Sequence, residues 1–180
     1  MLINNLSILM KERNVKNAVL SLKTGISKNT ISQLSNNNNS MIQMETINKI
    51  CQILDVTPAE FFDYSPYEAS YAVEFGEEFE YPTPKERVKA FSAFVLIEKN
   101  GVEVDSVEMQ GFQKESDLFD GGILSTSYYI DELTLQKDKD VLHKYFSVQM
   151  QTHIYKMLRL KILSETKENY DDGNVSLRLI

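Results

Sequence analysis

Apolar residues in the first 64 positions recur at helical spacing, in short segments separated by polar or glycine-containing joins. This pattern predicts a first helix that ends near Arg13, a second that stops at Gly25 and a third that begins after Ser27, a suitable N-cap. A compact helical domain is therefore expected at the start of the chain. The residues expected to give these helices their apolar spacing are Ile3, Leu6, Leu9, Met10, Val19, Leu20, Leu22, Ile31 and Leu34.

Two more helices are predicted after residues 36–40, a polar loop of four asparagines and a serine. Thr57 as N-cap, Pro58 at the first helical position and Glu60 three residues after the cap predict a capping box at the start of the fifth helix. The residues expected to supply core bulk in this part of the chain are Ile47, Ile50, Cys51, Leu54, Phe61 and Phe62.

The pattern changes after Pro66, where alternating apolar residues predict strands. Alternation over 67–75 predicts one strand, and an acidic, proline-bearing connector at 77–84 follows it. Asn100-Gly101 lies between two apolar runs and predicts a β-hairpin, because this pair supplies the two positive φ angles of a type I′ turn. The apolar phase slips near Asp105-Ser106, which indicates a bulge there.

Residues 124–130 suit a further strand, and residues 175–179 alternate as a closing strand. Between them, helical spacing from Val141 to Leu163 predicts one long amphipathic helix, with Asp138 and Asp140 favourable at its start. The expected C-terminal domain is therefore α+β, with an antiparallel sheet and a long helix. We place the two domains at residues 1–66 and 67–180.

Charge divides the chain in the same way. The formal net charge is −7, but residues 1–66 carry six Lys or Arg against five Asp or Glu, a net of +1, so the remainder carries −8. Five of the six N-terminal cations lie between residues 11 and 28. Because phosphate contact depends on local charge, this cluster is compatible with nucleic-acid binding, while the acidic remainder should avoid nucleic acid.

The segment 17–36, Asn-Ala-Val-Leu-Ser-Leu-Lys-Thr-Gly-Ile-Ser-Lys-Asn-Thr-Ile-Ser-Gln-Leu-Ser-Asn, resembles the helix-turn-helix of the phage-repressor and Cro family, also called the XRE type. Two such helices cross steeply through a short turn, for which Gly25 can take a positive φ and Ser21 is small at the closest approach. The run 45–62 resembles the end of the same domain, so the resemblance covers about a third of the chain. It implies an all-α, five-helix, lambda-repressor-like domain that binds double-stranded DNA.

Three positions depart from what is usual in that family. Ser21 stands where alanine is common, Lys16 where a small hydroxyl cap is common, and Gln43 where serine or threonine is common. The serine is small enough to be tolerated. The weak caps at Lys16 and Gln43 cost about 1 kcal/mol each, which does not threaten the fold.

The resemblance also assigns the DNA contacts, because in that family the exposed face of the third helix meets the bases. Lys28 can donate to guanine, and Asn29 and Gln33 can pair with adenine. The expected base contacts are Lys28, Asn29, Ser32 and Gln33. The expected phosphate contacts are Lys16, Lys23, Ser27, Thr30 and Asn36.

Other kinds of site are not expected. His143 and His153 are ten residues apart, whereas paired ligands on one helix are three or four apart, so no metal or cofactor is expected. Cys51, the single cysteine, suits the core and a reducing cytoplasm. The sequence carries no common hydrolase motif and neither Ala-Gly nor Cys-Gly, the cut sites of self-cleaving phage repressors, so we expect no enzyme. No apolar run is long enough to span a membrane, and the start lacks the features of a secretory signal.

These observations lead to the hypothesis of a cytoplasmic transcriptional regulator, a repressor of phage or mobile-element type that acts as a homodimer. Residues 67–180 would join two copies, because a single domain of this size reads only a half-site. Two alternatives remain open for that domain. It docks a partner protein, as the C-terminal part of an antitoxin would, or it binds a small-molecule effector.

Overall fold

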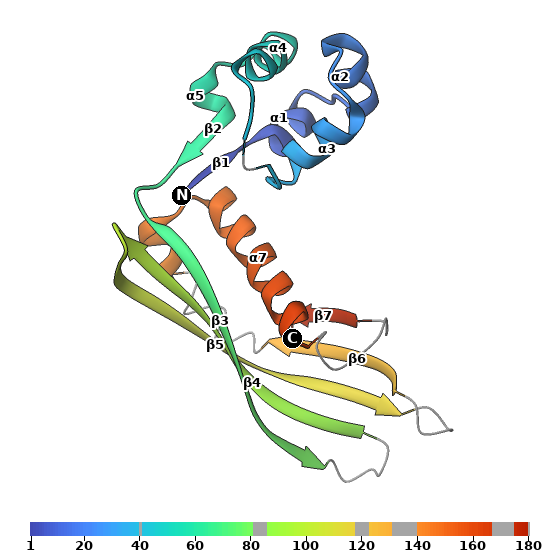
Figure 1. The fold of residues 1–180 in the computed structure, drawn as a ribbon, viewed down its shortest axis with the longest axis vertical. Helices are drawn as coiled ribbons and strands as arrows, with labels where there is room; N and C mark the ends of the chain where they lie inside the picture. The colour runs from blue at the N-terminus through green and yellow to red at the C-terminus, as the bar shows by residue number, and fades with distance from the viewer. Residues whose placement is uncertain (40, 81–85, 118–122, 131–139, 167–174, 180) are drawn as a thin grey trace. The chain divides into compact units, whose positions relative to one another are not determined.

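The computed structural model describes residues 1–39, 41–80, 86–117, 123–130, 140–166 and 175–179 (Figure 1). The chain divides into two compact units, Met1–Ser65 and Pro66–Ile180. The first unit is mainly helical, and the second combines a sheet with helices.

The first unit contains α1 (Leu6–Glu12), α2 (Asn17–Thr24), α3 (Lys28–Ser35), α4 (Met44–Leu54) and the single-turn α5 (Pro58–Phe61). Two predicted caps are present. The Ser27 hydroxyl accepts a hydrogen bond from the Thr30 N–H at 3.1 Å, and Thr57 and Glu60 form the capping box. Side chains from all these helices meet in one buried cluster: Leu6, Leu9, Met10, Leu20, Ile31, Leu34, Ile47, Ile50, Cys51, Leu54 and Phe61.

A short antiparallel ribbon in the first unit was missed by the helical interpretation of the N-terminus. It pairs β1 (Leu2–Asn4) with β2 (Phe62–Tyr64), and places Ile3 opposite Asp63. Ile3 is buried, but as a strand residue, and α1 begins only at Leu6. Its spacing from Leu6 suits a helix, yet pairing with a distant strand decides its conformation.

The second helix is less apolar on its inner side than predicted. Of its three proposed apolar positions, only Leu20 reaches the core, while Val19 is 41% exposed and Leu22 is 86% exposed. In α2 the three residues lie on different sides of the helix, because successive residues are about 100° apart.

The second unit is built on a five-stranded sheet, ordered β3 (Glu68–Glu80), β4 (Glu86–Lys99), β5 (Val102–Asp117), β6 (Ile123–Ile130) and β7 (Val175–Leu179). The pairs from β3 to β6 are antiparallel, as predicted for this sheet, but the closing strand β7 runs parallel to β6, which the prediction did not contain. A chain that returns through a helix can place its last strand parallel to the preceding one. The predicted connector at 77–84 is also partly wrong, since β3 continues to Glu80.

The β4–β5 hairpin forms at the predicted turn, where Asn100 and Gly101 have φ angles of 54° and 75°. The irregularity in β5 lies slightly before the predicted site. Glu98 pairs with Glu103 and Ile97 with Asp105, so Val104 is the extra residue of the bulge.

The predicted long helix is broken in two. Residues 140–145 are helical, Phe146 and Ser147 are not, and α7 (Val148–Thr166) follows. Ser147 caps α7, because its hydroxyl accepts a hydrogen bond from the Met150 N–H at 3.2 Å. The apolar spacing alone did not show this break, since Phe146 remains buried across it.

α7 covers one face of the sheet and packs against β3 and β4 (Figure 1). Burial follows a period of two on the strands and of about four on the helix, as their geometries require. The buried apolar strand residues are Phe91, Ala93, Val95, Ile97, Val107 and Met109, and the buried apolar residues of the segment 140–166 are Leu142, Phe146, Met150, Ile154, Leu158 and Ile162.

Candidate nucleic-acid interface

The turn between α2 and α3 is fixed by four hydrogen bonds. Gly25 has a φ of 73°, a left-handed conformation that closes α2, and its N–H bonds to the Ser21 carbonyl. The Ser21 hydroxyl donates to the Ile26 carbonyl at 2.6 Å. Thr24 is buried, donates from its hydroxyl to the Leu20 carbonyl at 2.6 Å and accepts from the Ile26 N–H at 3.2 Å. The turn therefore holds the two helices at a defined crossing.

This turn leaves one face of α3 outside the core. Ile31 and Leu34 are fully buried, whereas Lys28, Asn29 and Gln33 are exposed and Ser32 is half-buried. Within the described residues, the side chains of these four polar residues make no hydrogen bond or ion pair. Donors and acceptors that the protein itself does not satisfy are available to the edges of DNA bases.

The residues expected to contact phosphate lie around α3 rather than in one group. Ser27 and Thr30 lie 2.8 Å apart at the start of α3 and share a hydrogen bond, so each retains part of its capacity for another. At the other end of the helix, the Asn36 amide donates to the Ser32 carbonyl at 2.9 Å. Lys16 and Lys23 are exposed, at the two ends of α2.

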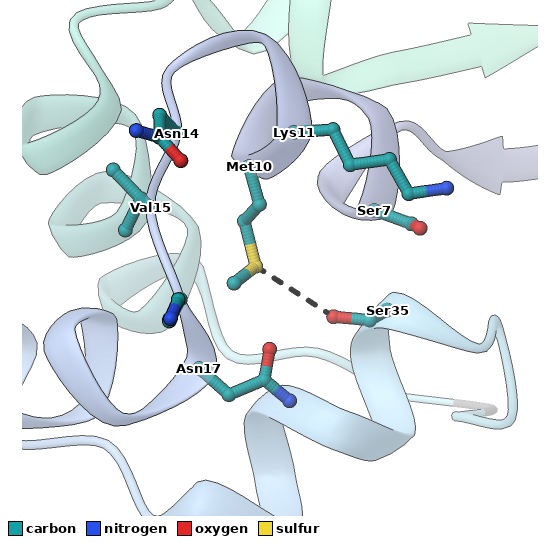
Figure 2. A pocket seen from close by; sticks show the side chains of 8 residues that line it. Ser7, Met10, Lys11, Asn14, Val15, Asn17 and Ser35 are labelled. Carbon is teal, nitrogen blue, oxygen red and sulfur yellow. Dashed lines mark hydrogen bonds between the residues drawn. The ribbon is translucent and has the colours of Figure 1, made fainter.

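A cleft at the start of α2 brings Lys16, an expected phosphate contact, together with Lys11 and Ser35, to which the sequence analysis assigned no contact. It encloses about 360 Å³ and is lined by side chains from α1, the following loop, the start of α2 and the end of α3 (Figure 2). Ser35 reaches it from α3, where its hydroxyl donates to the Ile31 carbonyl at 2.8 Å and lies 3.8 Å from the Met10 sulfur. The lining residues are Ser7, Met10, Lys11, Asn14, Val15, Lys16, Asn17 and Ser35.

Two exposed cations, Lys11 and Lys16, line this cleft from α1 and from the N-cap of α2. The Lys16 side chain does not cap the helix, and the first turn of α2 contains no acid. The first N–H groups of a helix have no partner within it and favour an anion. The sequence signal for Lys11 was its place in the cation cluster at 11–28, but only the fold shows that it shares a cleft with Lys16.

Two acids of the first unit, Glu45 and Glu60, are engaged elsewhere and do not oppose this positive surface. Glu45 pairs with Lys49 at 2.7 Å along α4, and this contact lowers the pKa of Glu45. Glu60 accepts from the Thr57 N–H at 2.7 Å in the capping box, and this hydrogen bond lowers the pKa of Glu60. Both carboxylates therefore stay ionised on α4 and α5.

The comparison with known families assigns this unit. Residues 5–67 match the family model of the Cro/C1-type helix-turn-helix DNA-binding domain. The N-terminal unit is a Cro/C1-type DNA-binding domain. Its α2, turn and α3 are the helix-turn-helix, and the resemblance inferred from residues 17–36 is confirmed. A domain of this type indicates that the protein is a DNA-binding transcription regulator.

The other comparisons add little to this assignment. A solved structure of a proposed DNA-binding protein from Bacteroides fragilis is 27% identical in sequence, with a TM-score of 0.33, and the match covers 35% of this chain and 100% of that one. No curated protein sequence matches the chain. The family assignment therefore rests on the family model and on the geometry of α2 and α3.

Beyond this surface, the described residues offer few further chemical sites. They contain no group of three or more His, Cys, Asp or Glu side chains that could hold a metal ion. Cys51 is buried on α4, and burial raises the pKa of its thiol. In the described ranges, no helix has both the length and the apolar character to cross a membrane.

Proposed function

We propose that this protein is a sequence-specific repressor that inserts α3 into the major groove of double-stranded DNA. The observation that carries the proposal is the outward face of α3, where Lys28, Asn29, Ser32 and Gln33 lie together with no internal partner among the described residues. Arg or Lys contacts to guanine and Asn or Gln contacts to adenine are the common specific pairings in this groove.

The DNA backbone would lie on both sides of that helix. Ser27 and Thr30 would contact phosphate at the start of α3 and Asn36 at its end, while Lys23 would add a contact from α2. The cleft lined by Lys11 and Lys16 would hold a further phosphate, with the first N–H groups of α2 as donors. The α4 and α5 acids, by contrast, are held in local contacts.

Two copies would bind one operator. Four base-reading side chains on one short helix specify only a few base pairs, and a two-fold dimer doubles that number. We propose that the second unit joins the copies and that the protein is a cytoplasmic binding protein rather than an enzyme. The operator would then be an inverted repeat whose half-sites lie about 34–36 Å apart, one turn of DNA, or a multiple of that distance.

Recovery of genomic fragments bound by the full chain tests this proposal. The expected result is enrichment of an inverted repeat near promoters, and reporter transcription from that promoter should fall when the protein is present. The matched control is the double variant Lys28→Ala/Gln33→Ala, which should lose the enrichment while remaining folded. Equal enrichment by the variant, or no common sequence among the fragments, would contradict the assignment of α3 as the reading helix.

A further inference from the structure

The sheet of the second unit has one face that no described helix of that unit covers. α7 and residues 140–145 both lie on the other face, where the Tyr145 hydroxyl donates to Asp105 at 2.9 Å and the Tyr145 ring meets Tyr67. Strand residues alternate between faces, so the even-numbered positions of β3 and β4 point away from α7. We name this surface the open face and define it by Ala72, Glu74, Phe94, Leu96, Glu98 and Glu108.

The open face has an apolar centre beside carboxylates that are held in position. Phe94 lies between Ala72 on β3 and Glu108 on β5, and the Phe94 and Leu96 side chains are only half-buried. The Ser92 hydroxyl donates to the Glu108 carboxylate at 3.0 Å. The Ser70 hydroxyl donates to Glu98 at 2.7 Å in the same way.

Charge is segregated between the two faces. The described lysines of β4 lie on the α7 side, where Lys89 is 5.4 Å from the centre of the Phe75 ring and Lys99 is 5.3 Å from that of Tyr67. On the open face, strand portions 68–76, 88–98 and 102–113 contribute glutamates but no Lys or Arg side chain. Over these three strand portions, the open face is therefore acidic around its apolar centre at Phe94 and Leu96.

We propose that the open face docks a basic segment of another protein, one that carries apolar side chains between its lysines or arginines. Complementary charge favours such a partner, and the apolar centre at Phe94 and Leu96 gives it area to bury. A second copy of this chain is disfavoured there, because two acidic faces would oppose each other across the interface. DNA is repelled for the same reason. This proposal goes beyond DNA recognition and does not depend on it.

Fluorescence anisotropy with the full chain provides the test. The probe is a short labelled peptide that alternates lysine with phenylalanine or leucine, and its glutamate counterpart serves as the negative control. The double variant Glu74→Lys/Glu108→Lys should weaken binding of the basic peptide by about tenfold or more, because it reverses two charges of the open face. Phe94→Ser should weaken it without any change in charge.

Matched controls separate a docking face from a general effect of net charge. The double variant Glu12→Lys/Asp140→Lys changes the net charge by the same amount at two exposed positions outside the open face. Its affinity for the basic peptide should stay within about twofold of the wild type. Circular dichroism establishes that each variant is folded before its affinity is compared.

Two outcomes would overturn the proposal. An equal loss of affinity in both double variants would show that peptide binding depends only on the net charge of the protein. No loss of affinity in either variant would show that the peptide does not bind the open face. Light scattering tests whether a second copy of this chain occupies the open face. If the wild type is a dimer and Phe94→Ser makes it a monomer, the open face is a contact between copies instead. A dimer that persists in Phe94→Ser supports a separate docking role.

Discussion

Asn4 and Asn37 hold each other reciprocally across 33 residues of sequence. The Asn37 side-chain oxygen accepts from both the backbone N–H and the side-chain amide of Asn4, at 2.8 and 2.7 Å, and the Asn37 amide donates to the Asn4 carbonyl at 3.0 Å. The Asn4 amide also donates to the Leu34 carbonyl at 3.0 Å. These bonds attach β1 to the last turn of α3, the proposed reading helix.

The first prediction concerns this attachment. Asn37 has a φ of 55°, so Asn37→Ala would lose its hydrogen bonds and also strain the backbone. We expect a loss of stability on the order of 1–3 kcal/mol for the first unit. Asn37→Gly removes the same hydrogen bonds but accepts the positive φ, so it should lose less. Hydrogen exchange of the full chain, followed in peptides from Met1–Ser65, measures the stability of both variants. An Asn37→Ala variant more stable than Asn37→Gly would contradict the prediction.

The second prediction concerns the turn before α3. A Cβ added at Gly25 would meet no atom within 4 Å, so any penalty there arises from its φ of 73° and not from a collision. Gly25→Val should therefore destabilise the first unit by roughly 1–3 kcal/mol and weaken DNA binding. Gly25→Asn is the control, because asparagine tolerates the left-handed region and should be close to neutral. Thermal unfolding of the full chain, followed by circular dichroism, compares the two variants, and equal melting temperatures would count against the backbone argument.

The helix-turn-helix could be predicted from the sequence because its determinants are local. Ser27, Gly25 and the capping box at Thr57 act within a few residues, and each has one preferred geometry. The β1–β2 ribbon and the role of Asn37 depend on pairing between residues more than 30 positions apart, which periodicity does not contain. Asn37 appeared in the sequence only as part of a solvated loop.

In the candidate site, too, local features could be predicted from the sequence and features that depend on tertiary packing could not. The outward positions of α3 followed from the helical period once Ile31 and Leu34 were placed inside. The cleft between Lys11 and Lys16 did not, because it depends on how α1 and α2 pack. In the second unit, neither the direction of β7 nor the break at Phe146 could be predicted from the apolar pattern. Apolar residues continue at helical spacing through the break.

The third prediction concerns that break. Gln151 is buried, and its amide nitrogen donates to the Phe146 carbonyl at 2.8 Å and lies 2.9 Å from Nδ1 of His143. Because an amide nitrogen only donates, Nδ1 accepts the second bond. Gln151→Leu should cost on the order of 1–3 kcal/mol through the unpaired carbonyl. Gln151→Glu should also be destabilising at neutral pH, since its carboxylate cannot donate to the Phe146 carbonyl and would be repelled by that oxygen. Chemical denaturation measures both variants, and a glutamate variant as stable as the wild type would contradict this arrangement.

The fourth prediction is a pH dependence at Glu60. The Thr57 N–H, and then the Thr57 hydroxyl at 2.8 Å, hold the pKa of Glu60 below its usual value of 4.5. A carboxyl whose pKa is lowered by folding stabilises the fold above its unfolded pKa, and this contribution is lost as the pH falls through the folded pKa. Glu60→Gln keeps an acceptor oxygen but not the charge. The stability gap between wild type and Glu60→Gln should therefore be widest at neutral pH and should narrow as the pH falls below 4.5 and through the lowered pKa of Glu60. Thermal unfolding across this range measures the gap, and a gap that widens in acid would contradict the prediction.

The last prediction separates base reading from phosphate contact on a DNA site recovered with the full chain. Lys28→Ala or Gln33→Ala should each cost roughly 1–3 kcal/mol of binding free energy and relax the preference at one or two base pairs, because both side chains are exposed on the outward face of α3. Lys11→Ala and Lys16→Ala remove cleft cations, so each should weaken binding to all sequences alike and lower the slope of log affinity against log salt by about one. Lys49→Ala is the matched control, since Lys49 pairs with Glu45 on α4 and should leave both the preference and the slope unchanged. Titrations against the site and its single-base variants at several salt concentrations measure all three classes. If Lys28→Ala changes only the salt slope while Lys16→Ala changes the base preference, α3 does not lie in the groove as proposed, and the start of α2 reads the sequence instead.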